Sequence, residues 1–320
     1  MELLLIGFSR FARRRVLPAV ASLPGITAVD VASRHATPGD LAGVVKARDL
    51  YGDWRAAVEV CAPGLAYVSL ENGEHGVVVR ELVERGWHVV VDKPACVDAG
   101  TVESARRSGV VLAEATCYSF HPVFRVVEGF AADTRQVVAV FTPPVPVDDF
   151  RHDPVRGGGA LLDTGPYLAS LGRVLWGLEP EEVSVVVGER EGGLVLSYSV
   201  LARYAQGRSV VGHFGFTGVY QNTLQLLGGR QVVDVRRPFS MPPGLETEVR
   251  VRDGGGERVV RVPPADSMAV FLGRVLDAVS TGSREFDGPL LGDARTLGRL
   301  VRAAGAGGER WGGGVESGFP

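Results

Sequence analysis

The chain begins Met1-Glu2-Leu3-Leu4-Leu5-Ile6-Gly7-Phe8-Ser9-Arg10-Phe11-Ala12, and this stretch decides the fold. Residues Glu2–Ile6 form an apolar run of the length expected for a buried β-strand. Gly7 follows directly, and Arg10–Ser22 carries apolar residues at helical spacing. A strand, a glycine turn and a helix in this order predict a β–turn–α unit.

The same alternation continues through the first third of the chain. Further strands are expected at 26–32, 65–70, 88–91 and 110–114, with helices at 74–85 and 99–108. Apolar strands separated by helices are typical of a parallel sheet that is covered on both faces. Right-handed crossovers between such strands give a doubly wound, Rossmann-like sheet. We therefore predict an α/β fold with a dinucleotide-binding Rossmann domain over residues 1–118.

The pattern changes after residue 118. Helices are expected at 121–130 and 160–176, with strands at 136–141, 183–187, 193–200, 209–216, 223–227, 231–235 and 248–251. Strands that follow one another without helices favour an open, mostly antiparallel sheet in an α+β domain. Helices at 267–281 and 291–304 would close it. We assign residues 119–304 to this second domain, and the Gly-rich residues 305–320 to a flexible tail.

Composition excludes several classes of protein. The 34 Lys and Arg residues and 37 Asp and Glu residues give a net charge of −3, which argues against a nucleic-acid binder. The apolar runs are too short to cross a membrane, and we find no signal peptide. Three cysteines without CxxC spacing imply neither a disulfide framework nor a metal site. We expect a cytoplasmic protein.

The turn after the first strand is suited to a pyrophosphate. Gly7 stands where a tight turn is needed, and the small Ala12 allows close packing of helix on strand. Ser9 replaces the second glycine of the usual motif, and an ordinary βα turn would look similar. Candidate cofactor-binding residues here are Gly7, Ser9, Arg10 and Phe11.

The end of the second strand bears on the choice of cofactor. NAD-binding folds commonly place an acid there for the ribose hydroxyl, whereas an Arg accommodates a 2′-phosphate. The sequence has Ser33 and Arg34 at this point, and Asp30 lies too early in the strand. NADP(H) is favoured over NAD(H). The alternative is that Arg34 is only a solvated loop cation.

Polar residues follow two other strands of the predicted sheet. Asp92-Lys93-Pro94 ends one strand, and Glu71-Asn72-Gly73-Glu74-His75 follows another. Ligands of open α/β sheets bind at the carboxyl ends of the strands, so Lys93, Asn72 and His75 would share one edge. Each residue alone is more typical of loop capping. Lys93 is one of two lysines among the 34 cations; the other, Lys46, is expected at the solvated surface.

A second group of residues lies in the segment 157–167, GGGALLDTGPY. Asp163 and Tyr167 are four residues apart and share a face of a continuous helix. A Tyr hydroxyl can donate a proton to a developing alkoxide, and a nearby cation such as Lys93 would lower its pKa. The bland alternative is a core Tyr beneath a glycine loop.

These two groups together resemble the Gfo/Idh/MocA oxidoreductase family. The resemblance rests on Asp92-Lys93-Pro94 and on the segment 157–167, and it extends to about residue 300. It implies a Rossmann domain followed by a domain for substrate binding and oligomerisation, in a homo-oligomer (dimer or tetramer) formed through the open sheet. By resemblance Lys93 is the catalytic lysine, Tyr167 exchanges the proton and Asp163 is the motif acid. The residues implied around nicotinamide and its ribose are Leu70, Asn72, His75, Asp92 and Lys93.

Further segments resemble the sugar-nucleotide 3-ketoreductase branch of deoxysugar and antibiotic biosynthesis. They include a Tyr at the last motif position and Phe150-Arg151 before the glycines. The implied activity is NADP(H)-dependent reduction of a ketone on a nucleotide-linked sugar, whose binding residues would be Lys93, Arg151, Asp163 and Tyr167. Alternatives on this fold are an imine or dihydrodiol-type reductase, an NAD-dependent glycosidase and a catalytically silent binding protein.

The chain departs from the family pattern at three positions. Asp92 replaces Glu, Glu71 replaces Pro, and Ser9 replaces Gly. The first shortens a side chain beside Lys93, and the second adds a negative charge near the nicotinamide site. We therefore expect an altered choice of substrate but no loss of a proton donor.

Overall fold

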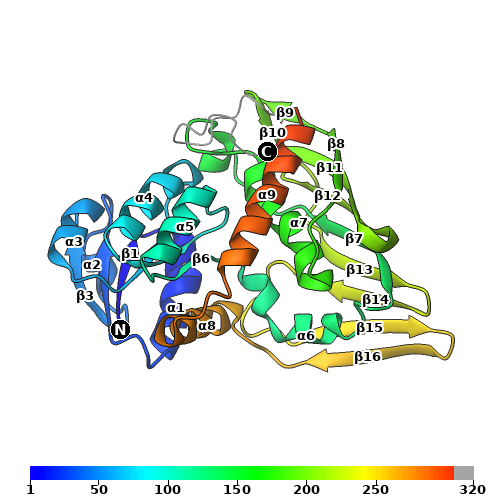
Figure 1. The fold of residues 1–320 in the computed structure, drawn as a ribbon, viewed down its shortest axis with the longest axis horizontal. Helices are drawn as coiled ribbons and strands as arrows, with labels where there is room; N and C mark the ends of the chain where they lie inside the picture. The colour runs from blue at the N-terminus through cyan, green and yellow to red at the C-terminus, as the bar shows by residue number, and fades with distance from the viewer. Residues whose placement is uncertain (306–320) are drawn as a thin grey trace. The chain divides into compact units, whose positions relative to one another are not determined.

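The computed structural model describes residues 1–305, and they divide into two compact units (Figure 1). Unit 1 comprises Met1–Ala115 and Met268–Leu291, and unit 2 comprises Thr116–Ser267 and residues 292–305. The predicted tail, apart from Gly305, lies outside the described residues. No helix within residues 1–305 has the length and apolar character needed to cross a membrane.

Unit 1 is built on a six-stranded, fully parallel sheet, as predicted. Its strands lie in the order β3 (Ala47–Tyr51), β2 (Ala28–Ala32), β1 (Glu2–Ile6), β4 (Leu65–Val68), β5 (His88–Val91) and β6 (Leu112–Glu114). The strand order reverses between β1 and β4, which is the doubly wound order of the Rossmann fold. Ligands of such sheets bind outside this switch point, at the carboxyl ends of the strands.

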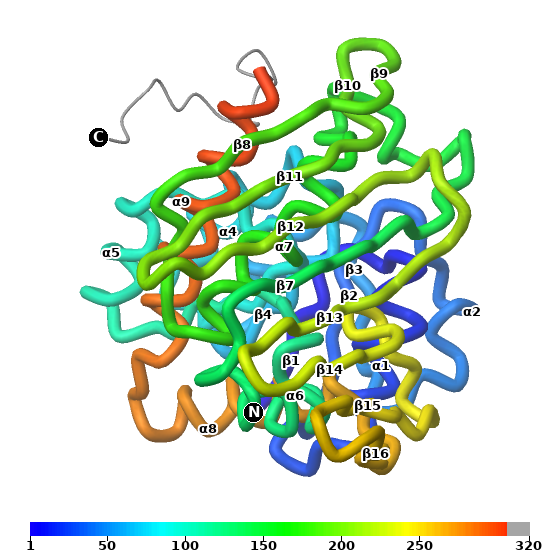
Figure 2. Tube along the Cα trace, turned by 90° about the vertical axis from the view of Figure 1, so that its right-hand side faces the viewer, coloured from blue at the N-terminus to red at the C-terminus, as the bar shows by residue number. Residues whose placement is uncertain are grey.

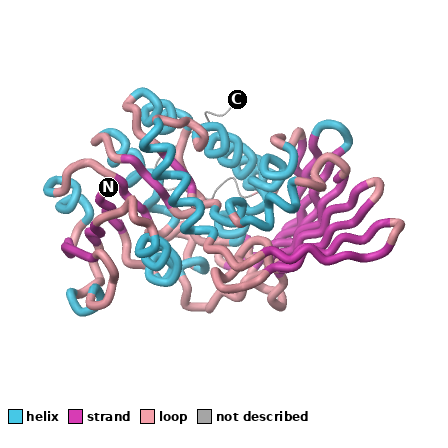
Figure 3. Tube along the Cα trace, turned by 90° about the horizontal axis from the view of Figure 1, so that it is seen from below, coloured by secondary structure: helices cyan, strands magenta, loops and turns pink. Residues whose placement is uncertain are grey.

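Most helices of unit 1 connect these strands, whereas the last of them follows the strands of unit 2 in the chain. Figure 3 shows strands running among helices. Their bounds are α1 (Leu17–Ser22) after the π-helical turn η1 (Ala12–Val16), α2 (Pro38–Leu41), α3 (Trp54–Val60), α4 (Asn72–Glu84), α5 (Ala99–Arg107) and α8 (Ser267–Thr281). Val79 and Val102, from α4 and α5, pack in one core cluster with Ile6, Val68 and Val91 of the sheet. Burying these apolar residues fixes the strand ends that carry the candidate site.

The sequence did not predict β3, α2 or α3. β3 is an edge strand that pairs only with β2, and its central residues Arg48 and Asp49 are exposed. An edge strand with polar residues lacks the apolar run by which the other strands were found. The strand expected at 65–70 also ends earlier, at Val68, so that Leu70 lies in the turn beyond it.

Unit 2 is built on an eight-stranded, mostly antiparallel sheet, also as predicted (Figure 2). Its order is β16 (Gly256–Val262), β15 (Thr247–Asp253), β14 (Gln231–Arg236), β13 (Asn222–Gly228), β7 (Thr134–Phe141), β12 (Arg208–Gly215), β11 (Ser197–Tyr204) and β8 (Glu182–Val187). Only β7 and β12 pair in parallel among these. Neither β16 nor β9 (Arg190–Glu191) was predicted, and the residues of both are mostly exposed. The strand expected at 193–200 is divided into the short β10 (Leu194–Val195), which pairs with β9, and the start of β11.

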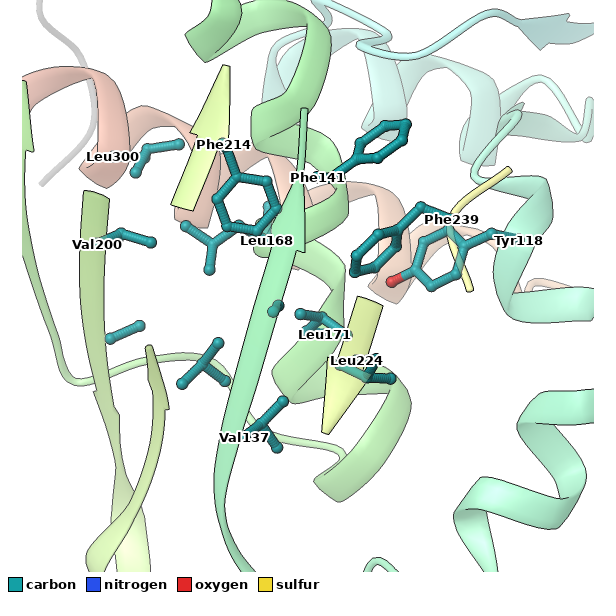
Figure 4. Packing of buried hydrophobic residues seen from close by; sticks show 14 of the residues in the cluster. Tyr118, Val137, Phe141, Leu168, Leu171, Val200, Phe214, Leu224, Phe239 and Leu300 are labelled. Carbon is teal, nitrogen blue, oxygen red and sulfur yellow. The ribbon is translucent and has the colours of Figure 1, made fainter. Parts of the chain in front are cut away.

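Helices cover one face of this second sheet. They are α6 (Pro122–Glu128), α7 (Ala160–Trp176) and the C-terminal part of α9 (Asp287–Ala303), with short 3₁₀ turns η2 (Cys117–Phe120), η3 (Phe150–His152) and η4 (Ala205–Gly207). Gly165 and Gly172 let α7 approach its neighbours closely. A Cβ at Gly165 would clash with Leu297 of α9, and one at Gly172 would clash with the ring of Tyr204. The core of unit 2 lies between α7 and the sheet (Figure 4).

Candidate active site

The turn after β1 admits no side chain at Gly7. Gly7 has φ +90°, and a Cβ there would clash with the carbonyl oxygen of Ser69 at the end of β4. Its N–H donates to the carbonyl of Ala32 (2.9 Å), so the turn joins the ends of three strands. Only glycine tolerates this combination of backbone angle and close approach.

Ser9 provides a side-chain hydrogen-bond acceptor, which a glycine at this position would lack. Its Oγ accepts a hydrogen bond from the N–H of Ala12 (2.9 Å) and lies 2.8 Å from Oγ of Ser69. The hydroxyl thus caps the first turn of the helix that follows Gly7. Ala12 is fully buried, which agrees with its predicted close packing. Arg10 and Phe11 are exposed in the same turn.

The end of β2 carries Ser33 and Arg34, as the sequence indicated. The Ser33 hydroxyl accepts hydrogen bonds from the backbone N–H groups of His35 and Ala36 and so shapes the loop. The Arg34 side chain is 66% exposed, with one nitrogen 3.7 Å from a Glu74 carboxylate oxygen. Such a long, exposed ion pair holds the guanidinium only weakly.

Asp30 forms an ion pair within the sheet and takes no part in the loop after β2. Its carboxylate is 3% exposed and pairs with Arg48 of the neighbouring strand, with an Nη2–Oδ2 distance of 2.5 Å. Arg48 also binds Glu2. The Asp30 carboxylate is therefore occupied within the sheet and does not serve a ribose hydroxyl.

Asp92 anchors the turn that carries Lys93. Its two carboxylate oxygens accept hydrogen bonds from the hydroxyls of Tyr67 and Ser69, each at 2.6 Å. Burial raises the pKa of Asp92, and these two donors act in the opposite direction. Because Ser69 also contacts Ser9, a chain of hydroxyls links the glycine turn to the turn beyond β5.

Lys93 follows Asp92 at the carboxyl end of β5 and is half-exposed. The Lys93–Pro94 peptide bond is cis. The backbone on either side is fixed by two hydrogen bonds: Asp92 N–H donates to the Val68 carbonyl (2.9 Å), and Ala95 N–H donates to a Glu114 carboxylate oxygen (2.7 Å).

His75 and Asn72 open helix α4 beside this turn. We predicted that both belong to the loop that faces the cofactor, but the His75 side chain lies beneath that edge with no exposed surface. Its ring nitrogens contact backbone carbonyl oxygens, Nδ1 that of Pro94 (2.7 Å) and Nε2 that of Leu70 (3.1 Å). The imidazole therefore acts on the protein backbone. Asn72 is 6% exposed in the first turn of the helix.

In unit 2 the glycine run precedes α7 for a steric reason. A Cβ at Gly158 would clash with the carbonyl oxygens of Arg151 and Asp153, and Gly159 has φ +98°. The N–H groups of Gly158 and Gly159 donate to those two carbonyls, Asp153 and Arg151 respectively. The glycines thus let the 3₁₀ turn η3 lie directly against the start of α7.

Arg151 and Asp163, both predicted to contact substrate, bind each other. Arg151 Nε donates to Oδ1 of Asp163 (2.9 Å), and its Nη1 donates to Oδ1 of Asp149 (2.9 Å). The Asp163 side chain is 10% exposed and that of Arg151 28%. Asp149, which caps the same 3₁₀ turn, was not predicted as a site residue.

Tyr167 lies one turn after Asp163 within a cluster of aromatic rings. Its ring centroid is 4.9 Å from that of Phe141, 5.3 Å from Phe239 and 5.6 Å from Tyr118. Figure 4 shows these three neighbours gathered at one end of the core. Burial raises the pKa of Tyr167, and the Asp163 charge raises it further. The phenol is therefore neutral at physiological pH and holds a proton that it can donate.

The two units thus carry features of a nicotinamide-dependent oxidoreductase: a Rossmann sheet with a glycine turn, and an α+β unit in which the partly buried Tyr167 keeps its proton. Residues 1–120 match the model of an oxidoreductase family with an NAD-binding Rossmann fold, and residues 125–233 match the GFO/IDH/MocA C-terminal domain. The chain belongs to the GFO/IDH/MocA oxidoreductase family, as its motifs predicted.

Relatives with known names span nearly the whole chain. The dTDP-3,4-didehydro-2,6-dideoxy-alpha-D-glucose 3-reductase of Saccharopolyspora spinosa is 28% identical over 307 residues, covering 90% of each chain. D-xylose 1-dehydrogenase (NADP(+)) 2 of Haloferax volcanii is 26% identical over 290 residues, covering 87% of this chain and 89% of the relative. KijD10, a 3-ketoreductase from Actinomadura kijaniata solved with NADP and TDP-benzene, has a TM-score of 0.86 and 25% identity, covering 95% of this chain and 97% of its own.

Proposed function

We propose that this protein is an NADP(H)-dependent reductase that converts a ketone on a nucleotide-linked deoxysugar into an alcohol. The observation that carries the proposal is the likeness to KijD10, which spans 95% of this chain. Two features of the chain support it: Lys93 follows β5, and the neutral phenol of Tyr167 lies in unit 2. The three free cysteines suit a reducing cytoplasm, where we place the enzyme.

The residues of unit 1 fit a dinucleotide with a 2′-phosphate. The turn at Gly7, which has φ +90°, leads directly into a helix, and the first N–H groups of a helix favour an anion such as a pyrophosphate. Arg34 supplies a cation at the end of β2, while Asp30 is occupied by Arg48. We propose that Gly7, Ser9, Arg10, Phe11, Ser33 and Arg34 hold the phosphates and ribose. NADPH, when bound, supplies the hydride.

Tyr167 would deliver the proton to the substrate oxygen as the alcohol forms. Its raised pKa keeps it protonated before reaction, and the same burial opposes formation of the phenolate. The proposal therefore requires the ammonium of Lys93 to act on the phenol oxygen of Tyr167, where its positive charge would lower the free-energy cost of losing the proton. Asp163 would hold the Arg151 guanidinium at the substrate. Neither described contact of Arg151 uses Nη2, and we propose that this nitrogen contacts the sugar.

We also propose that the enzyme is a homo-oligomer formed through the open face of the unit 2 sheet. Leu201, Val211 and Val138 lie side by side on β11, β12 and β7, with exposed fractions of 49%, 46% and 36%. Val186 on β8 is 73% exposed. A row of aliphatic side chains on three neighbouring strands is the kind of exposed patch that a second copy covers.

The proposal is tested with purified protein, NADPH and a TDP-linked 3-keto-deoxysugar. Lys93→Ala and Tyr167→Phe should each lower kcat by about 10²- to 10⁴-fold, the usual contribution of a positioned proton donor. NADPH affinity should be retained in both. The matched control is Tyr220→Phe, which removes the hydroxyl of a tyrosine that is 38% exposed. Near-wild-type turnover by both variants would contradict the assignment.

Comparison substrates separate the alternatives within this fold. Preferred turnover of a trans-dihydrodiol or a cyclic imine would indicate the corresponding reductase. Release of free sugar from a glycoside without net change in NADPH absorbance would indicate the glycosidase.

A further inference from the structure

His75 is a buried polar residue that the proposed chemistry does not use. It stands in the first turn of α4, and its side chain has no exposed surface. Burying an imidazole costs free energy that an aliphatic side chain at the same place would not. Its two ring nitrogens meet the carbonyl oxygens of Pro94 and Leu70, at 2.7 and 3.1 Å.

The two contacts are not equivalent. Carbonyl oxygens only accept, and a neutral imidazole has a single N–H to donate. Burial lowers the pKa of His75, although the charges of Asp92 and Glu74 act against that effect, so the neutral ring is favoured. The shorter contact assigns the N–H to Nδ1, which donates to the Pro94 carbonyl.

The position of Pro94, which follows Lys93, depends on the hydrogen bond to its carbonyl. Proline has no backbone N–H, so the carbonyl is the one backbone group through which Pro94 can be held by a hydrogen bond. The flanking residues have other anchors: hydroxyl donors hold Asp92, and Glu114 holds Ala95. Within the part of the chain that the structure describes, His75 is the hydrogen-bond partner of the Pro94 carbonyl.

We propose that His75 is a positioning residue: by donating from Nδ1 to the Pro94 carbonyl, it fastens helix α4 to the turn beyond β5 and so fixes where Lys93 points. The inference rests on the proposed function only where it predicts turnover. The part that concerns the position of Lys93 does not depend on the reaction and holds for any chemistry at this site.

Two variants separate the two contacts of the ring. In His75→Asn the amide nitrogen replaces Nδ1, two bonds beyond Cβ, and keeps a donor for Pro94. In His75→Gln the amide nitrogen replaces Nε2 instead and faces Leu70. Because a misplacement of about 1 Å can cost about 100-fold in rate, turnover of the Gln variant should fall at least tenfold below that of the Asn variant. NADPH affinity should not separate the two.

The scarcity of lysine provides a readout that does not depend on catalysis. Reductive ¹³C-methylation labels Lys93, Lys46 and the amino terminus, and it keeps their charge. The Lys93 NMR signal should shift or broaden in His75→Gln and stay near its wild-type position in His75→Asn. Lys46, held by the carbonyls of Val20 and Leu23, is the internal reference and should not change in either.

The outcomes separate the two proposals. A displaced Lys93 signal with unchanged turnover supports the positioning role and contradicts the catalytic role of Lys93. An unmoved Lys93 signal in a folded His75→Gln variant overturns the positioning role. If His75→Gln fails to fold, His75→Asn decides, because a Lys93 signal displaced in that variant also overturns it.

Discussion

The guanidinium of Arg151 donates through Nε to Oδ1 of Asp163 at 2.9 Å, in the first turn of the helix that carries Tyr167. Asp149 accepts from Nη1 of the same guanidinium. One cation thus balances two shielded carboxylates next to the proposed proton donor. It also lowers the pKa of Tyr167, against the effects of burial and of Asp163.

Removing this cation should destabilise the fold. In Arg151→Ala, Asp163 and Asp149 lose their partner, and we expect the free energy of unfolding to fall by about 2–4 kcal/mol, since breaking a buried pair leaves an uncompensated charge. The control is Arg250→Ala, whose exposed pairs with Glu248 and Glu257 should contribute about 1 kcal/mol or less. Urea denaturation measures both changes. Equal losses in the two variants would show that Asp163 does not depend on Arg151.

Stability should also fall at high pH, because burial raises the pKa of four tyrosines: Tyr118, Tyr167, Tyr198 and Tyr204. A group whose pKa is higher in the folded state adds stability below its unfolded pKa of about 10 and loses it as pH rises further. Four such groups predict a loss of about 5 kcal/mol per pH unit above that value.

Urea denaturation at pH 9, 10 and 11 tests this, with phenolate absorbance followed in parallel. Tyr220 is 38% exposed and its hydrogen bonds lower its pKa, so its phenolate should form in the folded protein. The phenolate signal of the four tyrosines with raised pKa should appear together with unfolding. A free energy of unfolding that stays constant over this range, or phenolate formed at these four tyrosines in the folded protein, would contradict the burial of their hydroxyls.

Elements with their own apolar pattern were predicted from the sequence, and some of them were predicted at their observed bounds. β1 and α7 are examples, because the apolar residues of a buried face recur at a regular spacing in the sequence. The edge strand β3 was missed because Arg48 and Asp49 occupy it, and its pairing with β2 depends on a neighbour distant in sequence.

Site residues that lie in a sequence motif could be predicted. The residues that hold them by hydrogen bonds from elsewhere in the chain could not. Asp92 stood out beside Lys93, but nothing local indicated that Tyr67 and Ser69 hold its carboxylate. Lys46 shows the same limit. We expected it at the solvated surface, yet its ammonium donates to the carbonyls of Val20 and Leu23 at the end of α1.

Arg34 should determine the preference between cofactors. Arg34→Ala would remove the proposed charge-assisted contact to the 2′-phosphate, typically worth about 1.5–3 kcal/mol, so the Kd for NADPH should rise about 10- to 100-fold. The Kd for NADH should not change, because NADH lacks that phosphate. The control is Arg55→Ala, a surface arginine of unit 1 that pairs with Glu81. Fluorescence titration of the wild type and both variants with each cofactor gives these dissociation constants. Tighter binding of NADH than of NADPH by the wild type would refute the role of Arg34.

The open face of the unit 2 sheet should govern assembly. Val211 lies between Leu201 and Val138 in the exposed apolar row, so Val211→Asp would place a carboxylate at its centre. Burying that charge against a second copy costs far more than exposing it to water, and the variant should be a monomer by light scattering. A monomer should lose little stability, because the side chain is already 46% exposed. The control is Val60→Asp on α3 of unit 1, where the valine is 73% exposed and is not part of the apolar row, so that assembly should not change. A Val211→Asp variant with the same oligomeric mass as the wild type would place the contact elsewhere.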